Sequence, residues 1–259
     1  MLTIGISSYN IKNHVPSDII SNNQFISPSN LKSQDYLNEI SDWTRNQKMV
    51  INQKKSKCMI FNYTKNYQFS TRLSIEGETL ETVSETKLLG TVITNDLRWS
   101  KNTTNIVKKA NKRMELLRKI SSFGATLSEL KNIYILYIRS LLEQSCTVWN
   151  SGLTQEDSEN LERVQKSALR IILQEKFTSY ENALNLLELE SLAERREILC
   201  MQFAKKCTTN PKMKHLFQPN NKTHPMNTRF EELYEVDHAN TGRLQNSPVI
   251  YMQNLLNGV

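Results

Sequence analysis

The sequence predicts an α+β fold, in which one helix and several short antiparallel strands precede a larger, mainly α-helical region. Seven glycines and six prolines in 259 residues favour long helices over many turns. Short, partly alternating apolar runs end near Trp99, and apolar residues recur at helical spacing after it. No apolar run approaches the roughly 18 residues that a membrane-spanning helix needs, so none is predicted.

The chain divides into five predicted segments. Residues 1–30 contain two prolines and no sustained period, which predicts a linker or disordered lead-in. The next three are a mixed α and β region (31–100), a helical region (101–173) and further helices (174–210). Pro211, Pro219 and Pro225 interrupt the first part of residues 211–259, so a mostly irregular tail is expected there, with a last helix near Tyr251 to Leu256.

In the mixed region, a first helix is predicted over residues 31–48. Ser33 is its expected N-cap, because a serine hydroxyl accepts bonds from free helical N–H groups. Leu37, Ile40 and Trp43 recur every third residue and predict one buried stripe.

The strands are expected after this helix. Alternating residues on both sides of Glu76-Gly77-Glu78 predict a β-hairpin. Residues 87–94 are apolar and β-prone, and Gly90 within them marks a bulge or a close backbone approach.

The helical region begins with an amphipathic helix over residues 102–121. Its predicted buried stripe is Ile106, Ala110, Met114, Leu117 and Ser121. Lysines fall on the other side: Lys108, Lys112 and Lys119 roughly opposite, with Lys109 and Arg113 on a flank. Thr126 and Glu129 predict a capping box for a central helix that runs to about Trp149.

Charge is concentrated in the same region. The net charge is +7, and residues 101–150 carry 9 basic against 3 acidic side chains. A local surplus of this kind indicates an anionic partner. The competing interpretation is a plain solvated helix face. Arg195 and Arg196 lie among glutamates, which predicts ion pairs along their own helix.

Four cysteines, Cys58, Cys146, Cys200 and Cys207, lack the CxxC spacing of a metal site. Cys200 and Cys207 are seven residues apart and are expected on one helix face. Buried free thiols are therefore predicted, and no metal site.

Four segments and their order carry a resemblance. Asn52-Gln53-Lys54-Lys55-Ser56 precedes the predicted hairpin, Leu88-Leu89-Gly90 and Asp96-Leu97-Arg98-Trp99 follow it, and Leu161–Ile172 lies in the helical part. Residues 31–210 resemble the non-LTR retrotransposon reverse transcriptases, RNA-directed DNA polymerases of mobile elements, from just after the metal-binding turn through the thumb. The implied fold is a truncated palm followed by a thumb-like helical region.

The resemblance implies roles for seven residues. Lys55 matches a basic residue that approaches the incoming nucleotide, and Gly90 matches the hairpin that supports the primer end. The basic helix corresponds to the part of the thumb that grips the duplex backbone, through Lys108, Lys109, Lys112, Arg113 and Lys119. The implied partner is an RNA or DNA duplex backbone, not a membrane.

The sequence departs from this family at the catalytic centre. Such polymerases hold two divalent ions with carboxylates from two palm segments. No two aspartates are adjacent in this chain, and Asp18 is the one acidic residue among the first thirty. We therefore expect a degenerate transposable-element fragment with no catalytic residues, no polymerase activity and no cofactor, although the parent enzyme would need magnesium.

A second, partial resemblance links the Leu-Leu-Gly strand and the basic helix to the N-terminal region of AlkB homologue eight proteins. The dioxygenase or methyltransferase chemistry is not expected, because no histidine is followed two residues later by an acid and no glycine-rich loop occurs. The alternative function is a non-catalytic helical module for protein interaction. An intracellular location is expected from the lack of export signals; the compartment and the oligomeric state are left open.

Overall fold

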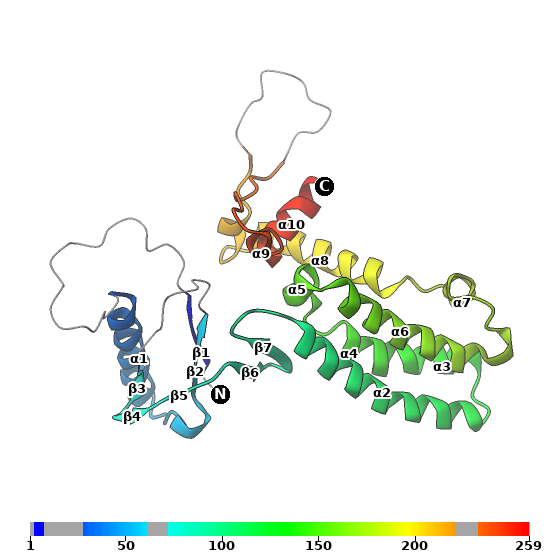
Figure 1. Ribbon diagram of the computed structural model, residues 1–259, viewed down its shortest axis with the longest axis horizontal. Coiled ribbons are helices and arrows are strands. Elements are labelled where there is room, and N and C mark those ends of the chain that lie inside the picture. The colour runs from blue at the N-terminus through cyan, green and yellow to red at the C-terminus, as the bar shows by residue number, and fades with distance from the viewer. Residues whose placement is uncertain (1–2, 8–27, 62–71, 221–232, 259) are drawn as a thin grey trace, which may run out of the picture. The chain divides into compact units, whose positions relative to one another are not determined.

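The computed structural model describes residues 3–7, 28–61, 72–220 and 233–258. The chain forms two compact units, Met1–Arg98 and Trp99–Val259 (Figure 1). The first unit combines helix and strands, and the second is helical. The division falls close to the change of period at Trp99 in the sequence.

A three-stranded sheet in the first unit is parallel throughout. Its order is β1 (Thr3–Ser7), β2 (Lys57–Phe61) and β5 (Glu81–Thr82). Parallel pairing of β1 with β2 requires a crossover, and α1 (Pro28–Asn46) lies between them in sequence. Two expectations are corrected here. The segment 1–30 contains a strand, and the short strands are not all antiparallel, because pairing partners are set by contacts distant in sequence.

Two antiparallel hairpins complete the first unit. β3 (Ser74–Ile75) and β4 (Glu78–Thr79) confirm the predicted hairpin at Glu76-Gly77. β6 (Glu85–Leu88) pairs with β7 (Thr91–Thr94), which shows that residues 87–94 are two strands rather than one. Both two-residue turns have positive φ at both positions, the conformation that matches the twist of the flanking strands.

The buried stripe expected on α1 is wrong. Leu37 is buried, but Ile40 is exposed and Trp43 is 58% exposed. A three-residue step falls about 60° short of a full turn, so Leu37 and Trp43 point about 120° apart. The side of α1 that packs against the strands includes Gln34 instead. Its Oε1 accepts a hydrogen bond from the N–H of Ser74 (3.0 Å), and its Nε2 donates one to the carbonyl of Ser74 (2.8 Å).

Among the described residues of the first unit, one apolar cluster consists of Leu37, Cys58, Leu73, Ile75 and Leu80, with Ile51 and Ile60 packed against it. Ser33 is not the N-cap of α1, because that helix begins five residues earlier, at Pro28.

The second unit is built from two long helices that lie side by side and a series of shorter ones. The long pair is α2 (Ser100–Ser122) and α6 (Gln155–Leu173) (Figure 1). Between them come α3 (Leu127–Ile133), a π-helical turn η2 (Tyr134–Arg139), α4 (Ser140–Leu142), α5 (Cys146–Trp149) and the 3-10 turn η3 (Asn150–Gly152). After α6 come η4 (Gln174–Lys176), α7 (Tyr180–Leu187), α8 (Leu192–Thr209), η5 (Lys214–Leu216), α9 (Gly242–Gln245) and α10 (Pro248–Asn257).

The capping box at Thr126 and Glu129 is confirmed, and a second one occurs at Ser191 and Glu194. The helix predicted to run to Trp149 starts at this box but is broken into α3, η2, α4 and α5. Ser145, just before α5, has a φ of 56°, which ends the preceding helical path.

The predicted ion pairs of Arg195 and Arg196 on their own helix are wrong. Arg195 Nε lies 3.1 Å from Oε1 of Glu143, which also lies 3.4 Å from Arg139 Nε. Arg196 is buried and bonds neutral groups, Asn150 Oδ1 and Ser158 Oγ, each at 2.8 Å. Helix packing, which local sequence does not reveal, selects these partners.

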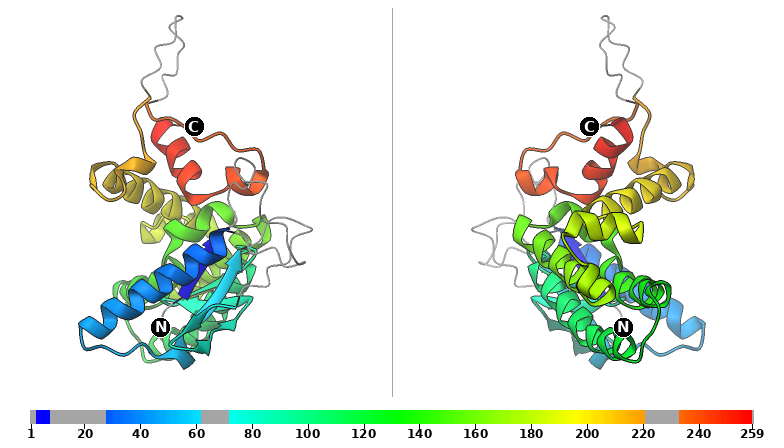
Figure 2. Two further views of the ribbon diagram at one scale, coloured as in Figure 1. Left: turned by 90° about the vertical axis from the view of Figure 1, so that its left-hand side faces the viewer. Right: turned by 90° about the vertical axis from the view of Figure 1, so that its right-hand side faces the viewer.

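The segment 211–259 is less irregular than predicted. Helix α10 confirms the expected last helix and packs beside α8 (Figure 2). The two helices share an apolar cluster of Ala204, Cys207, Phe217 and Met252. A tail that contributes to a core in this way is part of the folded unit.

Side chains of α10 also hold the ends of the segment that precedes it. Pro219 and Tyr234 form an antiparallel bridge. The amide of Asn257 bonds both the N–H and the C=O of Tyr234, each at 2.9 Å. Buried Gln253 donates to the carbonyl of Leu216 (2.9 Å) and accepts from the N–H of Asp237 (3.2 Å).

A close approach at the start of the second unit gives a first prediction. A Cβ on Gly152 would lie 2.7 Å from Cδ1 of buried Trp99. We expect Gly152→Ala to lower the free energy of unfolding by about 1–3 kcal/mol, because a packed ring must move. Urea unfolding followed by circular dichroism measures this, with Gly242→Ala as control, since nothing lies within 4 Å of its Cβ. Equal stability of the two variants would contradict it.

Candidate nucleic-acid interface

Helix α2 has the amphipathic character that the sequence predicts. Ile106, Ala110, Met114 and Leu117 are buried, and Ser121 is half-buried. Helix α2 also carries four exposed basic residues that we call the basic ridge: Lys108, Lys112, Arg118 and Lys119. At about 100° per residue, the three lysines fall within about 40° of one another, opposite Ala110, and Arg118 points about 80° away from Lys108.

The basic ridge outnumbers its acidic neighbour on α2, exposed Glu115, which lies between Lys112 and Lys119 along the helix. Within the described ranges, no acidic side chain lies within 4.0 Å of a ridge nitrogen. Elsewhere in the same unit, exposed Arg163 pairs with Glu159 at 3.6 Å. Uncompensated like charges at neighbouring helical positions cost a few tenths of a kcal/mol per pair, so an anionic partner would stabilise the ridge.

Helix α6 forms the other wall of a groove beside the ridge. The two helices are joined at their N-terminal ends by buried Asp157, which accepts bonds from Ser100 Oγ (2.7 Å) and Thr154 Oγ1 (2.8 Å). The groove has a volume of about 490 Å³. Its lining residues are Thr103, Thr104, Val107, Lys108, Asn111, Lys112, Glu115 and Asn160.

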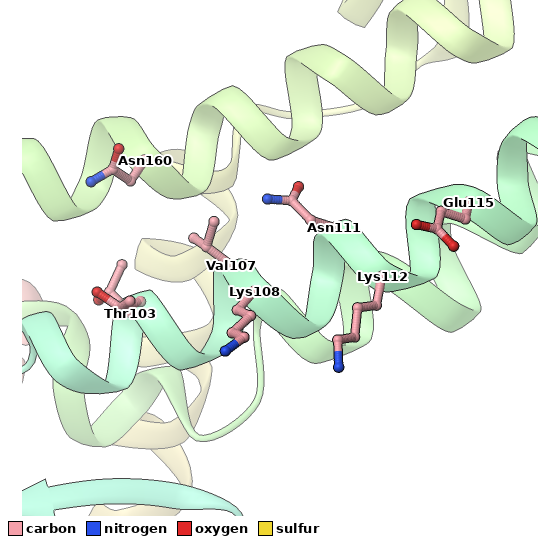
Figure 3. Close-up of a pocket in the computed structure, with 8 residues that line it drawn as sticks. Thr103, Val107, Lys108, Asn111, Lys112, Glu115 and Asn160 are labelled. Atoms are coloured by element: carbon pink, nitrogen blue, oxygen red, sulfur yellow. The ribbon is translucent and has the colours of Figure 1, made fainter.

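Seven of the eight residues that line the groove carry polar or charged groups; Asn160 belongs to α6 and the others to α2. In Figure 3, Val107 and Asn111 point toward α6, whereas Lys108 and Lys112 point to the opposite side of α2. Asn160 accepts a bond from Arg163 Nη1 through its Oδ1 (2.9 Å). Thr103 Oγ1 is buried and has no partner among the described residues. Hydroxyl and amide groups next to lysines are the donors and acceptors that sugar and phosphate groups require.

The two flanking basic residues differ from the ridge. Lys109 and Arg113 are half-buried. The guanidinium of Arg113 donates to the carbonyl of Tyr137 and lies over its ring, 4.4 Å from the centroid. Arg113 thus links α2 to the π-helical turn. Arg118 is not among the site residues that the sequence predicts, but it is exposed and is counted with the ridge. Its spacing of ten residues from Lys108 places it about 80° around the helix from that lysine, so the helical period does not single it out.

Lys55 and Gly90 belong to the first unit. Lys55 is exposed at the end of η1 (Gln53–Lys55), and its N–H donates to Asn52 Oδ1 at 3.1 Å. Asn52 therefore caps this short 3-10 helix, and the cap gives a local structural reason for the three-residue spacing between Asn52 and Lys55. Gly90 has a φ of 92° and Leu89 one of 47°, so the glycine serves the hairpin turn rather than a bulge.

No group of three or more histidine, cysteine, aspartate or glutamate side chains with metal-binding geometry occurs in the described part of the chain. Over the same residues, no helix combines the length and apolar character needed to cross a bilayer.

Comparisons with protein-family models, with curated proteins and with solved structures find no match to this chain.

Proposed function

We propose that this chain is a non-catalytic nucleic-acid-binding protein, related to the late palm and thumb of non-LTR retrotransposon reverse transcriptases. Its basic ridge on α2 contacts the phosphate backbone of an RNA or DNA duplex. The observation that carries the proposal is a set of four exposed basic side chains on one long helix, without ion pairs among the described residues, of which the three lysines lie opposite the buried side.

Electrostatics favours a polyanion over a single small anion. Lys108 and Lys119 are separated by 11 residues, or about 16 Å along the helix axis. That distance exceeds the screening length of about 8 Å at physiological salt, so one small anion cannot neutralise both ends of the ridge. A nucleic acid strand carries phosphates along its whole length and contacts both ends of the ridge at once; Arg118, which points to one side of the lysines, contacts the phosphates that flank them.

The absence of polymerase activity rests on the sequence. Two-metal phosphoryl transfer needs several carboxylates placed together, and the motif that supplies two of them in the reverse transcriptases is not present. The purified chain with magnesium, primer-template and labelled deoxynucleotides is expected to incorporate no label. Incorporation would refute a non-catalytic role.

Salt dependence of binding tests the backbone contact. A labelled duplex of about two helical turns is titrated with the protein at several salt concentrations, and fluorescence anisotropy gives the dissociation constant. Four phosphate contacts predict a log–log slope of about −3.6 on duplex DNA. A slope near zero would show that the ridge is a solvated surface only.

A second candidate function is a helical module for protein interaction. It is favoured by exposed apolar side chains in the second unit, among them Phe123 at 86% and Leu136 at 75% exposure. Light scattering after size-exclusion chromatography separates the candidates. A discrete oligomer without nucleic-acid affinity supports the interaction module, and a nucleic-acid-binding species with a steep salt slope supports the first proposal.

A further inference from the structure

Helix α2 carries a single acidic residue, and it lies beside the basic ridge. Glu115 is the only carboxylate between Ser100 and Ser122 in the sequence. It is exposed, lines the groove and has no ion pair among the described residues. At about 100° per residue, it falls within about 20° of Lys108 around the helix. A carboxylate in this position repels bound phosphates, so backbone contact alone gives no reason for it.

Around α2, the side chains change in character from the ridge toward α6. Glu115 comes first, Asn111 follows at about 60° from Lys108, and Val107 at about 100°. Val107 and Asn111 point toward α6 (Figure 3), and Asn160 lines the groove from α6 itself. The groove, with its volume of about 490 Å³, therefore offers a carboxylate, two amides and an apolar side chain next to a cationic surface.

The polar groups of the groove have unused hydrogen-bonding capacity. Glu115 and Asn111 make no side-chain hydrogen bond among the described residues. Asn160 accepts one bond from Arg163 through its Oδ1, which leaves both N–H groups of its amide as donors. Asn111 and Glu115 are exposed and Asn160 is half-buried, so a ligand in the groove can reach all three side chains.

Among the bases of a nucleic acid, guanine matches these groups best. A carboxylate accepts two parallel N–H bonds, and guanine alone presents two adjacent donors on one edge, N1–H and the N2 amino group. Its O6 and N7 atoms accept bonds from amide donors on the neighbouring edge. Adenine, cytosine and thymine each offer one donor group on the corresponding edge. Base pairing uses the N1 and N2 donors, so only an unpaired guanine has them free.

We propose that the groove between α2 and α6 binds an unpaired guanine of the nucleic acid whose phosphates lie on the basic ridge. Glu115 accepts bonds from N1–H and the N2 amino group, and the amides of Asn111 and Asn160 donate to O6 and N7. The inference rests on the proposed function and adds a base preference to it. An unpaired nucleotide is also the one that leaves the base stack at least cost.

Binding to bulged duplexes tests the proposal. Four labelled duplexes are identical except for one unpaired nucleotide at the centre, which is guanine, adenine, cytosine or thymine. Fluorescence anisotropy should show that the guanine duplex binds about tenfold more tightly than the other three, the discrimination typical of one bidentate base contact. A duplex with unpaired inosine, which lacks the N2 amino group, should lose most of this preference. Equal affinity for all five duplexes overturns the proposal.

Glu115→Gln separates base recognition from charge. Glutamine keeps the shape of the side chain but has one acceptor oxygen in place of two, so the preference for guanine should disappear. The loss of one negative charge should not weaken binding of a fully paired duplex. Glu175→Gln makes the same charge change at an exposed position on η4, outside the groove, and should keep the preference. A preference that survives Glu115→Gln would show that the base is bound elsewhere.

A titration with mononucleotides distinguishes failure of this inference from failure of the proposed function. Guanosine monophosphate should shift the side-chain amide signals of Asn111 and Asn160 in NMR spectra of isotope-labelled protein, and adenosine monophosphate should not. Steep salt dependence of duplex binding without any guanine preference would refute the groove site and leave the proposed function in place. A guanine-selective shift in a protein that binds no duplex would refute the proposed function and leave the groove site in place.

Discussion

Replacing Lys108, Lys112, Arg118 and Lys119 together by glutamine is expected to remove most of the salt dependence of duplex binding. Each phosphate contact contributes about 0.9 to the log–log slope, so the slope should fall from about −3.6 to near zero. Between 50 and 200 mM salt, this means that the wild-type protein loses affinity by a factor on the order of 100, and the variant loses almost none. Glutamine keeps the length and polarity of the side chains, so the fold of α2 should persist.

The matched control changes the net charge by the same amount elsewhere in the second unit. Lys176, Lys205, Lys206 and Lys212 are exposed and lie outside α2. Their replacement by glutamine should leave most of the salt slope in place. If this control loses as much of the slope as the ridge variant, binding reflects overall charge and the ridge is not the contact surface.

Gln165→Leu is expected to destabilise the second unit by about 3 kcal/mol. Gln165 is completely buried on α6 and accepts a bond from the hydroxyl of Tyr134. Its Nε2 donates to Tyr180 Oη (2.8 Å) and to the carbonyl of Glu190 (2.9 Å). Leucine has a similar volume but leaves the hydroxyl of fully buried Tyr134 without this acceptor, a loss that costs about 1–3 kcal/mol, and it also removes the part-buried bonds to Tyr180 and to the Glu190 carbonyl.

The network continues beyond Gln165, which raises the expected cost. The Tyr180 hydroxyl donates to Glu162 Oε1, and this oxygen also accepts the N–H of Leu192 at 3.0 Å. Burial, followed by the bond to Glu162, raises the pKa of Tyr180, so its hydroxyl stays protonated and remains a donor at neutral pH.

Urea unfolding measures the effect, and Gln155→Leu is the control on the same helix. Gln155 is exposed and bonds only the exposed side chain of Glu159 (3.0 Å) among the contacts described. Its replacement should change stability by no more than about 0.5 kcal/mol. A Gln165 variant as stable as this control would mean that the polar network is not a source of stability.

The parts of the fold that the sequence predicts are those with local causes. The buried stripe of α2, the capping box at Thr126 and the hairpin turn at Glu76-Gly77 depend on residues within one or two turns of chain. The basic ridge follows from the same helical period, since a helix that buries Ala110 must expose Lys108 and Lys112.

The parts that were missed depend on contacts between distant residues. Packing decides three of these features: the parallel pairing of β1 with β2, the contact of α10 with α8, and the burial of Arg196. Arg113 is an instructive case, because its spacing on α2 suggests a flank of the ridge. The carbonyl and ring of Tyr137, on a turn that sequence reasoning took for regular helix, provide its partners instead.

The bonds that Asn257 makes to Tyr234 have a practical consequence for protein engineering. The two bonds use the same backbone N–H and C=O groups that a neighbouring strand would pair with. Together with the bridge between Pro219 and Tyr234, they fix the positions of the chain at residues 219 and 234. A reporter peptide or fluorophore acceptor sequence inserted between these two points would enter and leave the fold at Pro219 and Tyr234, and an unchanged melting temperature would show that the insertion is tolerated. This position is therefore a rational attachment point for immobilising or labelling the protein without touching α2.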